Sequence, residues 1–256
     1  MSLSRSCLLL LIIAGCSSSV STPNPAHTSV PASNSVPVAG AVPLEKSQPS
    51  QAAPWGGLDV QFAGVPLNRA RQIVILLHGY GATGSDLVPL ADHLAGEARA
   101  FIFPAAPVPL GEGGLAWGTN EAQLADSTAR MTTLITELSK TYPGVAISVG
   151  GFSQGGTISA MLLNDRSFYL QHVLLYSPGI VREKLFPARP TPPQIFLSHG
   201  STDRVIPIAE SERLRKNLET LGYTVNWHQF KDGHTLTAEL LAASRQQLDA
   251  TSLPVQ

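Results

Sequence analysis

The chain alternates, from about residue 55 onward, between short apolar runs and longer segments with helical spacing of apolar residues. Continuous apolar runs rich in β-branched residues are typical of strands that are buried on both faces, as in parallel sheets. These runs predict strands over 72–77, 100–103, 145–149, 172–176, 194–198 and 224–228. The segments between them predict helices over 86–96, 121–140, 154–164, 208–221 and 235–249. This order indicates an α/β fold, a mostly parallel central sheet with helices on both faces.

The first 54 residues have a different pattern. Arg5 and the apolar run over 8–14 are typical of a secretory signal peptide, and the run is too short to span a bilayer as a helix. The tetrapeptide ending at Cys16 resembles the lipobox of bacterial lipoproteins. That resemblance implies cleavage before Cys16 and a lipid on it, and so an exported protein anchored in a membrane and facing the periplasm or the cell exterior.

The segment that follows Cys16 is rich in Ser, Pro, Ala and Thr and has almost no charge. Such a composition buries too little apolar surface to offset chain entropy, so we expect a disordered tether. The predicted organisation is a signal peptide over 1–15, a lipidated N-terminus and tether over 16–54, and a single catalytic domain over 55–256.

Charge and cysteine content exclude several classes of function. The formal net charge is −1 and no basic stripe is present, which argues against nucleic acid as a partner. The two cysteines are Cys7 and Cys16, so the predicted domain has neither a disulfide nor a cysteine nucleophile. Its scattered histidines lack acidic residues at ligand spacing, which argues against a metal site.

The motif with the clearest chemistry is a G-x-S-x-G sequence over 151–155, centred on Ser153. It directly follows a predicted strand and precedes a predicted helix, which is the setting that a nucleophile elbow requires. A turn this sharp needs small residues two positions before and after the serine. It exposes the serine Oγ and directs the helix N-terminus toward it. Ser153 is therefore the predicted nucleophile.

The partners of this serine are predicted from chain order. In hydrolases with such an elbow, the acid and then the histidine follow the serine, on loops after later strands. Asp203 follows the strand predicted over 194–198, and His234 follows the strand predicted over 224–228. We predict that His234 is the general base and that Asp203 orients it.

Other acids and histidines fit this order less well. Asp232 is too close to His234 to lie on a separate loop, and Asp165 falls on the helix that follows the nucleophile. His199 could serve as the base, but it precedes the acid loop and so breaks the order. His78 is expected to pack beneath the loop after its strand.

A transition-state oxyanion requires backbone N–H groups that already point toward it. Gln154, directly after the nucleophile, is expected to supply one, and the Gly-rich loop over 78–84 the other, for which we choose Tyr80. This loop lacks the Gly-Lys-Ser/Thr ending of a phosphate-binding P-loop.

At these positions the sequence resembles the phospholipase/carboxylesterase family, which includes the acyl-protein thioesterases. The resemblance extends over most of the domain and is carried by four motifs in order, over 77–86, 151–156, 199–207 and 233–234. It implies a compact α/β-hydrolase that cleaves carboxylic esters, and sometimes thioesters, without a cofactor. The triad and oxyanion positions that it implies are the residues already named.

The resemblance also implies a substrate-binding residue, Trp117, which matches an aromatic that borders the acyl site of the family. The residues over 118–120 depart from the family pattern, which leaves the size of the acyl pocket open. The stretch over 177–193 is short and Pro-rich, which predicts no large lid and a preference for small, soluble esters.

The sequence therefore predicts a serine carboxylesterase that hydrolyses small or medium acyl esters through an acyl-enzyme. A thioesterase or lysophospholipase would use the same residues, and an inactive binding module on the same fold is a further alternative.

Overall fold

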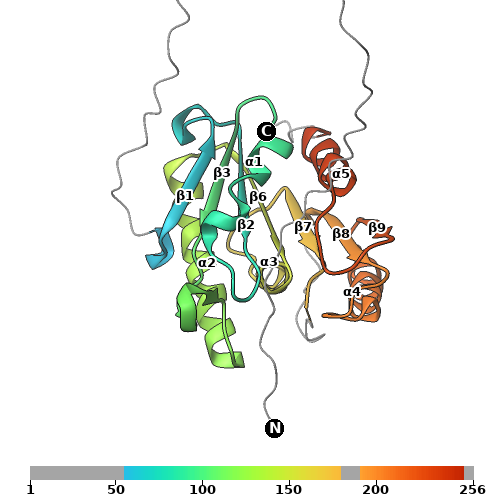
Figure 1. Cartoon of the computed structure of the whole chain (residues 1–256). Coiled ribbons are helices and arrows are strands. Elements are labelled where there is room, and N and C mark those ends of the chain that lie inside the picture. Colours follow the sequence, from blue (N-terminus) through green and yellow to red (C-terminus); the bar gives the residue numbers. More distant parts are fainter. Residues whose placement is uncertain (1–54, 180–190, 251–256) are drawn as a thin grey trace, which may run out of the picture.

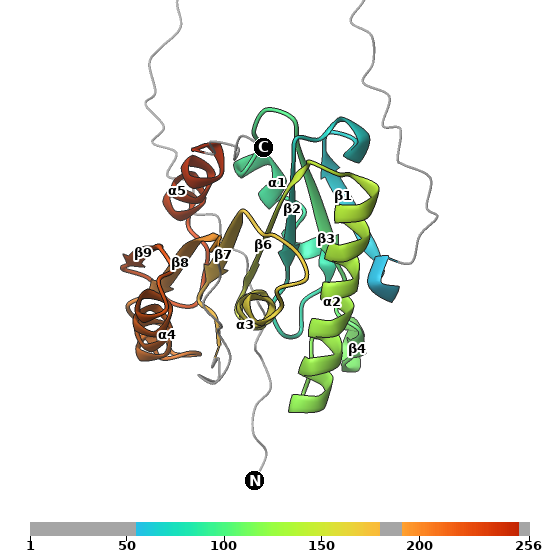
Figure 2. The same cartoon turned by 180° about the vertical axis from the view of Figure 1, so that it is seen from behind.

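The central sheet lies between two layers of helices (Figures 1 and 2). The computed structural model describes residues 55–179 and 191–250. Within these ranges seven strands pair in the order β1-β3-β2-β6-β7-β8-β9. All neighbouring pairs are parallel except β1 and β3, which are antiparallel. The strands are β1 (Val60–Gly64), β2 (Gln72–Leu77), β3 (Arg99–Pro104), β6 (Ala146–Phe152), β7 (His172–Tyr176), β8 (Gln194–Gly200) and β9 (Val225–Phe230).

Alternating side chains of the central strands build a core on each face of the sheet, which explains their continuous apolar runs. Ile73 and Ile75 belong to one core cluster together with residues of α2, α3 and α4, whereas Val74 belongs to the other together with residues of α1 and α5. The helices are α1 (Leu90–His93), α2 (Glu121–Thr141), α3 (Gln154–Met161), α4 (Ile208–Thr220) and α5 (Ala238–Asp249). The predicted α/β architecture is therefore confirmed. No helix in the described ranges is long and apolar enough to cross a membrane.

Local differences from the prediction have physical causes. The helix predicted over 86–96 is instead a short 3-10 turn, Gly84–Leu87, followed by the single turn of α1, with Pro89 between them. The edge strand β1 was not predicted, because its half-exposed residues do not form an apolar run. The short pair β4 (Val108–Pro109) and β5 (Leu115–Ala116) was also missed.

The parallel strands bring several chain segments to one edge of the sheet. Strands β2, β6, β8 and β9 run in the same direction, so the residues after Leu77, Phe152, Gly200 and Phe230 meet at the carboxyl edge. Ligand sites of open α/β sheets form outside this edge. Every candidate residue of the predicted triad follows one of these strand ends.

Candidate active site

Ser153 occupies a strained turn between β6 and α3. Its φ of 55° and ψ of −119° lie in a region that residues other than glycine rarely adopt. A Cβ atom at Gly151 would collide with the backbone of Gly155, and one at Gly155 would collide with the carbonyl of Leu77. The spacing of the motif thus follows from the tight approach of α3 to β2. Such strain typically costs about 1–3 kcal/mol and is concentrated at functional sites.

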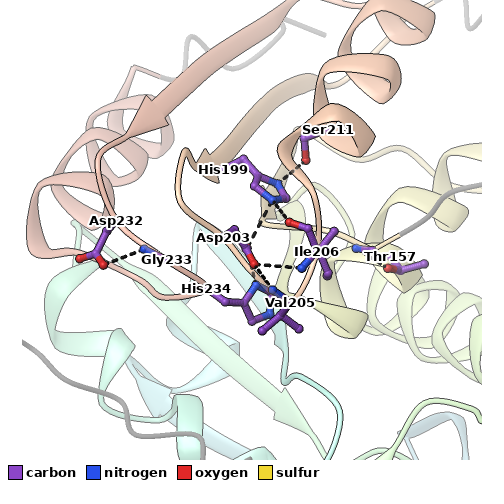
Figure 3. A network of polar contacts seen from close by, with 10 residues as sticks. Thr157, His199, Asp203, Val205, Ile206, Ser211, Asp232, Gly233 and His234 are labelled. Carbon is purple, nitrogen blue, oxygen red and sulfur yellow. Dashed lines mark hydrogen bonds and ion pairs between the residues drawn. The ribbon is translucent and has the colours of Figure 1, made fainter.

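Asp203 and His234 form a hydrogen-bonded pair at the same edge (Figure 3). The Nδ1 atom of His234 lies 2.6 Å from the Oδ2 atom of Asp203. A carboxylate can only accept, so Nδ1 carries the proton and Nε2 keeps a lone pair for a proton from elsewhere. The loops that carry the pair are tied together, because the Thr202 N–H donates to the Asp232 carbonyl at 3.0 Å.

The environment of Asp203 favours its ionised form. Burial alone would raise the pKa of this carboxyl, but hydrogen bonds from the Ile206 N–H, the His234 ring and the Val205 N–H lower it overall. The two backbone N–H groups donate to Oδ1 at 2.9 Å and 2.8 Å. The side chain of Asp203 is fully buried. An ionised, buried acceptor of this kind can orient His234 and stabilise it when it becomes protonated.

The His234 ring lies beside the elbow. Its centroid is 4.6 Å from that of the Phe152 ring, on the residue directly before Ser153. Within the described residues no hydrogen bond joins the Ser153 Oγ to the His234 ring. In many enzymes this contact closes only when substrate binds.

The surroundings of His199, the alternative base, argue against a role as the base. Its side chain is fully buried, and Nε2 lies 2.9 Å from the carbonyl oxygen of Ile206. It therefore does not face a substrate. Asp232 instead accepts from the N–H of Gly233 at 2.7 Å, as a turn residue would.

The loop predicted to supply the second oxyanion donor lies against the nucleophile. A Cβ atom at Gly79 would lie 3.4 Å from the Cβ of Ser153. In the described part of the chain, the backbone N–H groups of Tyr80 and Gln154 have no hydrogen-bond acceptor. The next residue is fixed, because the Gly81 N–H donates to the Leu115 carbonyl at 2.8 Å. Two free donors beside a serine are what an oxyanion hole requires.

Trp117 lies beneath this loop. Its side chain is fully buried, and its indole N–H donates to the carbonyl of His78 at 2.8 Å. In this position Trp117 supports the backbone that leads into the oxyanion loop. Its expected contact with an acyl group stays a prediction.

The side chain of Gln154 has a role that the sequence did not reveal. Its Oε1 accepts from the backbone N–H of Trp117 at 2.8 Å, and its Nε2 donates to the carbonyl of Gly118 at 2.7 Å. His78 completes the support: its Nε2 accepts from the Ala106 N–H at 3.0 Å, so Nδ1 carries the proton and donates to the Gly79 carbonyl at 2.8 Å. Burial accordingly lowers the pKa of His78. The Trp117 indole and the His78 ring thus hold the loop over 78–84 directly, and Gln154 holds the segment that carries Trp117.

Comparison with known proteins identifies the family to which the chain belongs. The model of the phospholipase/carboxylesterase family matches residues 61–252. Acyl-protein thioesterase 1 of Saccharomyces cerevisiae is 29% identical over 168 residues, which are 54% of this chain and 73% of that protein. The protein of the same name from Eremothecium gossypii is 26% identical over 199 residues, or 67% of this chain and 84% of its own.

Solved structures share the fold. Esterase PE8 superposes with a TM-score of 0.66 at 24% identity and covers 75% of this chain and 98% of its own. The Bacillus cereus carboxylesterase superposes with a TM-score of 0.65 at 24% identity, covering 75% of this chain and 93% of its own.

Proposed function

Because this chain belongs to the phospholipase/carboxylesterase family and is a hydrolase that acts on esters, we propose that it is a serine carboxylesterase for small or medium acyl esters, with a triad of Ser153, His234 and Asp203. The observation that carries the proposal is the Asp203–His234 pair, joined at 2.6 Å beside a strained serine elbow. Its closest rival on the same residues is thioester hydrolysis, which the names of the two thioesterase relatives favour.

The geometry supports a two-step reaction. In the first step, His234 Nε2 takes the Ser153 proton while Oγ forms a bond to the acyl carbon, and the negative charge moves to the former carbonyl oxygen. The N–H groups of Tyr80 and Gln154 hold that oxyanion. When the bond to the alcohol breaks, His234 returns the proton to the leaving oxygen and the acyl group stays on Ser153.

Water releases the acyl group in the second step. His234 takes a proton from the water, whose oxygen attacks the acyl carbon, and the same donors hold the second oxyanion. Collapse of this intermediate returns the proton to Ser153 and releases the carboxylic acid. Asp203 accepts the His234 Nδ1–H throughout and stabilises the imidazolium of each step.

The test is hydrolysis of p-nitrophenyl acetate, butyrate and octanoate by the wild type and by Ser153→Ala. We expect turnover by the wild type and a loss of about four orders of magnitude or more in the variant. Ser167→Ala, at an exposed serine away from the strand ends, is the matched control and should keep full activity. Full activity of Ser153→Ala would contradict the mechanism, and a wild type inactive on all three esters would favour the binding module.

Chain length and leaving group separate the substrate classes. We expect kcat/KM to be higher for acetate and butyrate than for octanoate. A butyryl thioester cleaved more efficiently than p-nitrophenyl butyrate would assign the protein as a thioesterase instead. The segment over 180–190, which includes most of the stretch that predicted the absence of a lid, lies outside the described residues.

We also propose, from the sequence alone, that the protein is exported and carries lipid on Cys16. This cysteine lies outside the described residues. Mass spectrometry of the mature N-terminus should show an acylated Cys16 as its first residue. An unmodified Cys16, or cleavage at another position, would refute the proposal.

A further inference from the structure

A second histidine contacts the triad carboxylate (Figure 3). His199, near the end of β8, places its Nε2 3.3 Å from the Oδ2 of Asp203. The same nitrogen lies 2.9 Å from the carbonyl oxygen of Ile206, which belongs to the loop over 201–207 that carries Asp203, the acid loop. The ring is fully buried. His199 therefore contacts the acid from the side away from solvent.

The contacts of the ring determine where its proton lies. Nε2 faces two oxygen atoms that can only accept, so Nε2 must carry a proton. Nδ1 lies 2.7 Å from the Oγ of Ser211, a hydroxyl that can donate to it. A neutral ring protonated on Nε2 thus satisfies both of its nitrogens. Ser211, in α4, selects this tautomer.

These contacts add to those that hold Asp203 and the loop that carries it. Oδ1 accepts from two backbone N–H groups of the acid loop and Oδ2 accepts from His234, while the His199 Nε2–H donates to the Ile206 carbonyl and lies 3.3 Å from Oδ2. Without His199, the Ile206 carbonyl would lose its hydrogen-bond partner and Oδ2 would lose the ring that lies 3.3 Å from it. Oδ1 would keep its two backbone donors, but the acid loop would lose its tie to β8 and Asp203 would be held less firmly toward His234.

We propose that His199 is a positioning residue for ester hydrolysis: its Nε2–H, oriented by Ser211, donates to the Ile206 carbonyl beside Oδ2 and so holds the acid loop with Asp203 in place to receive the Nδ1–H of His234. The inference rests on the proposed function, in which Asp203 and His234 serve Ser153. It adds a fourth and a fifth side chain to the machinery, neither of which touches the substrate.

Kinetics of matched variants test the proposal. His199→Leu removes the donor and should lower kcat on p-nitrophenyl butyrate on the order of 10–100-fold, as small misplacements of reacting groups do, with KM changed less than about twofold. His199→Gln keeps an N–H donor near the position of Nε2 and should restore most of kcat. Ser211→Ala should lower kcat severalfold. His172→Leu, at a buried histidine of β7, is the control for a purely structural loss and should keep kcat.

Proton NMR supplies a readout that does not depend on turnover. A ring proton bonded to a carboxylate resonates far downfield, and Asp203→Asn assigns the signal of the His234 Nδ1–H by removing it. The signal should persist in His199→Gln and His172→Leu, and should shift upfield or broaden in His199→Leu. If His199→Leu is recovered unfolded, Ser211→Ala decides by the same two measurements.

The outcomes separate the two claims. If Ser153→Ala abolishes turnover while His199→Leu and Ser211→Ala keep both kcat and the downfield signal, the role of His199 is refuted and the proposed function stands. If Ser153→Ala keeps full activity, the proposed function fails, and with it the positioning role of His199. An unchanged signal in His199→Leu would then also refute its contact with Asp203.

Discussion

The two edges of the central sheet both bury a polar network, but the proposed chemistry lies at only one of them. At the carboxyl edge, Asp203 and His234 lie on loops after strand ends, and a free lone pair remains on His234 Nε2. At the amino edge, Arg99 is buried with hydrogen bonds to Gln72 Oε1 at 2.5 Å, to the Leu94 carbonyl at 2.5 Å and to Asp249 at 2.8 Å.

The difference lies in what each network leaves unused. Each of the three guanidinium nitrogens of Arg99 donates to a partner, so this network joins β3 to β2, to the end of α1 and to α5 and stabilises the fold. At the carboxyl edge the N–H groups of Tyr80 and Gln154, like His234 Nε2, have no acceptor or donor within the described residues. Burial of polar groups alone therefore does not point to an active site. The proposed site differs from the Arg99 network because its hydrogen-bonding groups remain available to a substrate at the carboxyl ends of strands.

A matched pair of Asp→Asn variants, one at each edge, should show the largest difference in activity. Asp203→Asn should lower kcat by about four orders of magnitude, because the amide cannot hold His234 in the required tautomer. Asp249→Asn should leave kcat unchanged. Steady-state kinetics on p-nitrophenyl butyrate measures both, and equal losses of activity would contradict the assignment of the two edges.

Asp249→Asn should instead affect stability. The change weakens a charged hydrogen bond to the buried Arg99, and such bonds contribute about 2 kcal/mol. Urea denaturation at pH 7 should show a decrease of about this size in the free energy of unfolding. A stability equal to the wild type would mean that Arg99 is satisfied by Gln72 and Leu94 alone.

The pH dependence of stability tests whether His172, which begins β7 at the amino edge, is neutral in the folded protein. Burial, and secondly the charge of Arg99, lower the pKa of His172 from 6.5 to about 4. The unfolded chain therefore binds a proton on His172 before the folded chain does, so the fold loses stability as the pH falls from about 6.5 toward 4. Between pH 7 and pH 4.5 this loss amounts to about 2 kcal/mol.

His172→Leu removes this contribution. Urea denaturation at both pH values should show a smaller loss for the variant than for the wild type. His78 and His228, whose pKa values burial also lowers, keep contributing to the slope in both proteins. The stability contributed by Asp203 is lost only at lower pH, because its lowered pKa lies below 3.8. Identical slopes for the two proteins would contradict a neutral, buried His172.

The smallest expected effect lies at the exposed rim of the amino edge. Arg71 and Glu97 form an ion pair at 3.7 Å with side chains 77% and 90% exposed. Water screens such pairs, so Glu97→Gln should change the free energy of unfolding by no more than about 0.5 kcal/mol. A larger change in urea denaturation would show that the pair is coupled to the buried network.

Much of the fold could be predicted from the sequence because both faces of the central strands are covered, which forces continuous apolar runs. Strand β7 has the predicted bounds, and β6 is longer because it continues through Gly150 and Gly151, which sequence patterns assign to turns. The antiparallel edge strand β1 was missed because only part of it faces the core. Pro89 ended a helix that apolar spacing alone would have continued.

The candidate site was predictable only where chemistry follows chain order. Ser153, Asp203 and His234 each follow a strand that can be recognised from its apolar residues. The Gln154 side chain holds the backbone of Trp117, which lies 37 positions away, and the contact of His199 with Asp203 depends on how the acid loop folds back. Neither interaction has a signature in the local sequence.

The central claim is that Ser153 becomes acylated, and covalent labelling tests it most directly. The wild type is treated with a fluorophosphonate, digested and mapped by mass spectrometry. We expect one adduct per chain, on Ser153, with labelling that is much slower in Asp203→Asn because His234 is no longer oriented. An adduct on another residue, or an unlabelled Ser153 in a protein that still hydrolyses esters, would contradict the account.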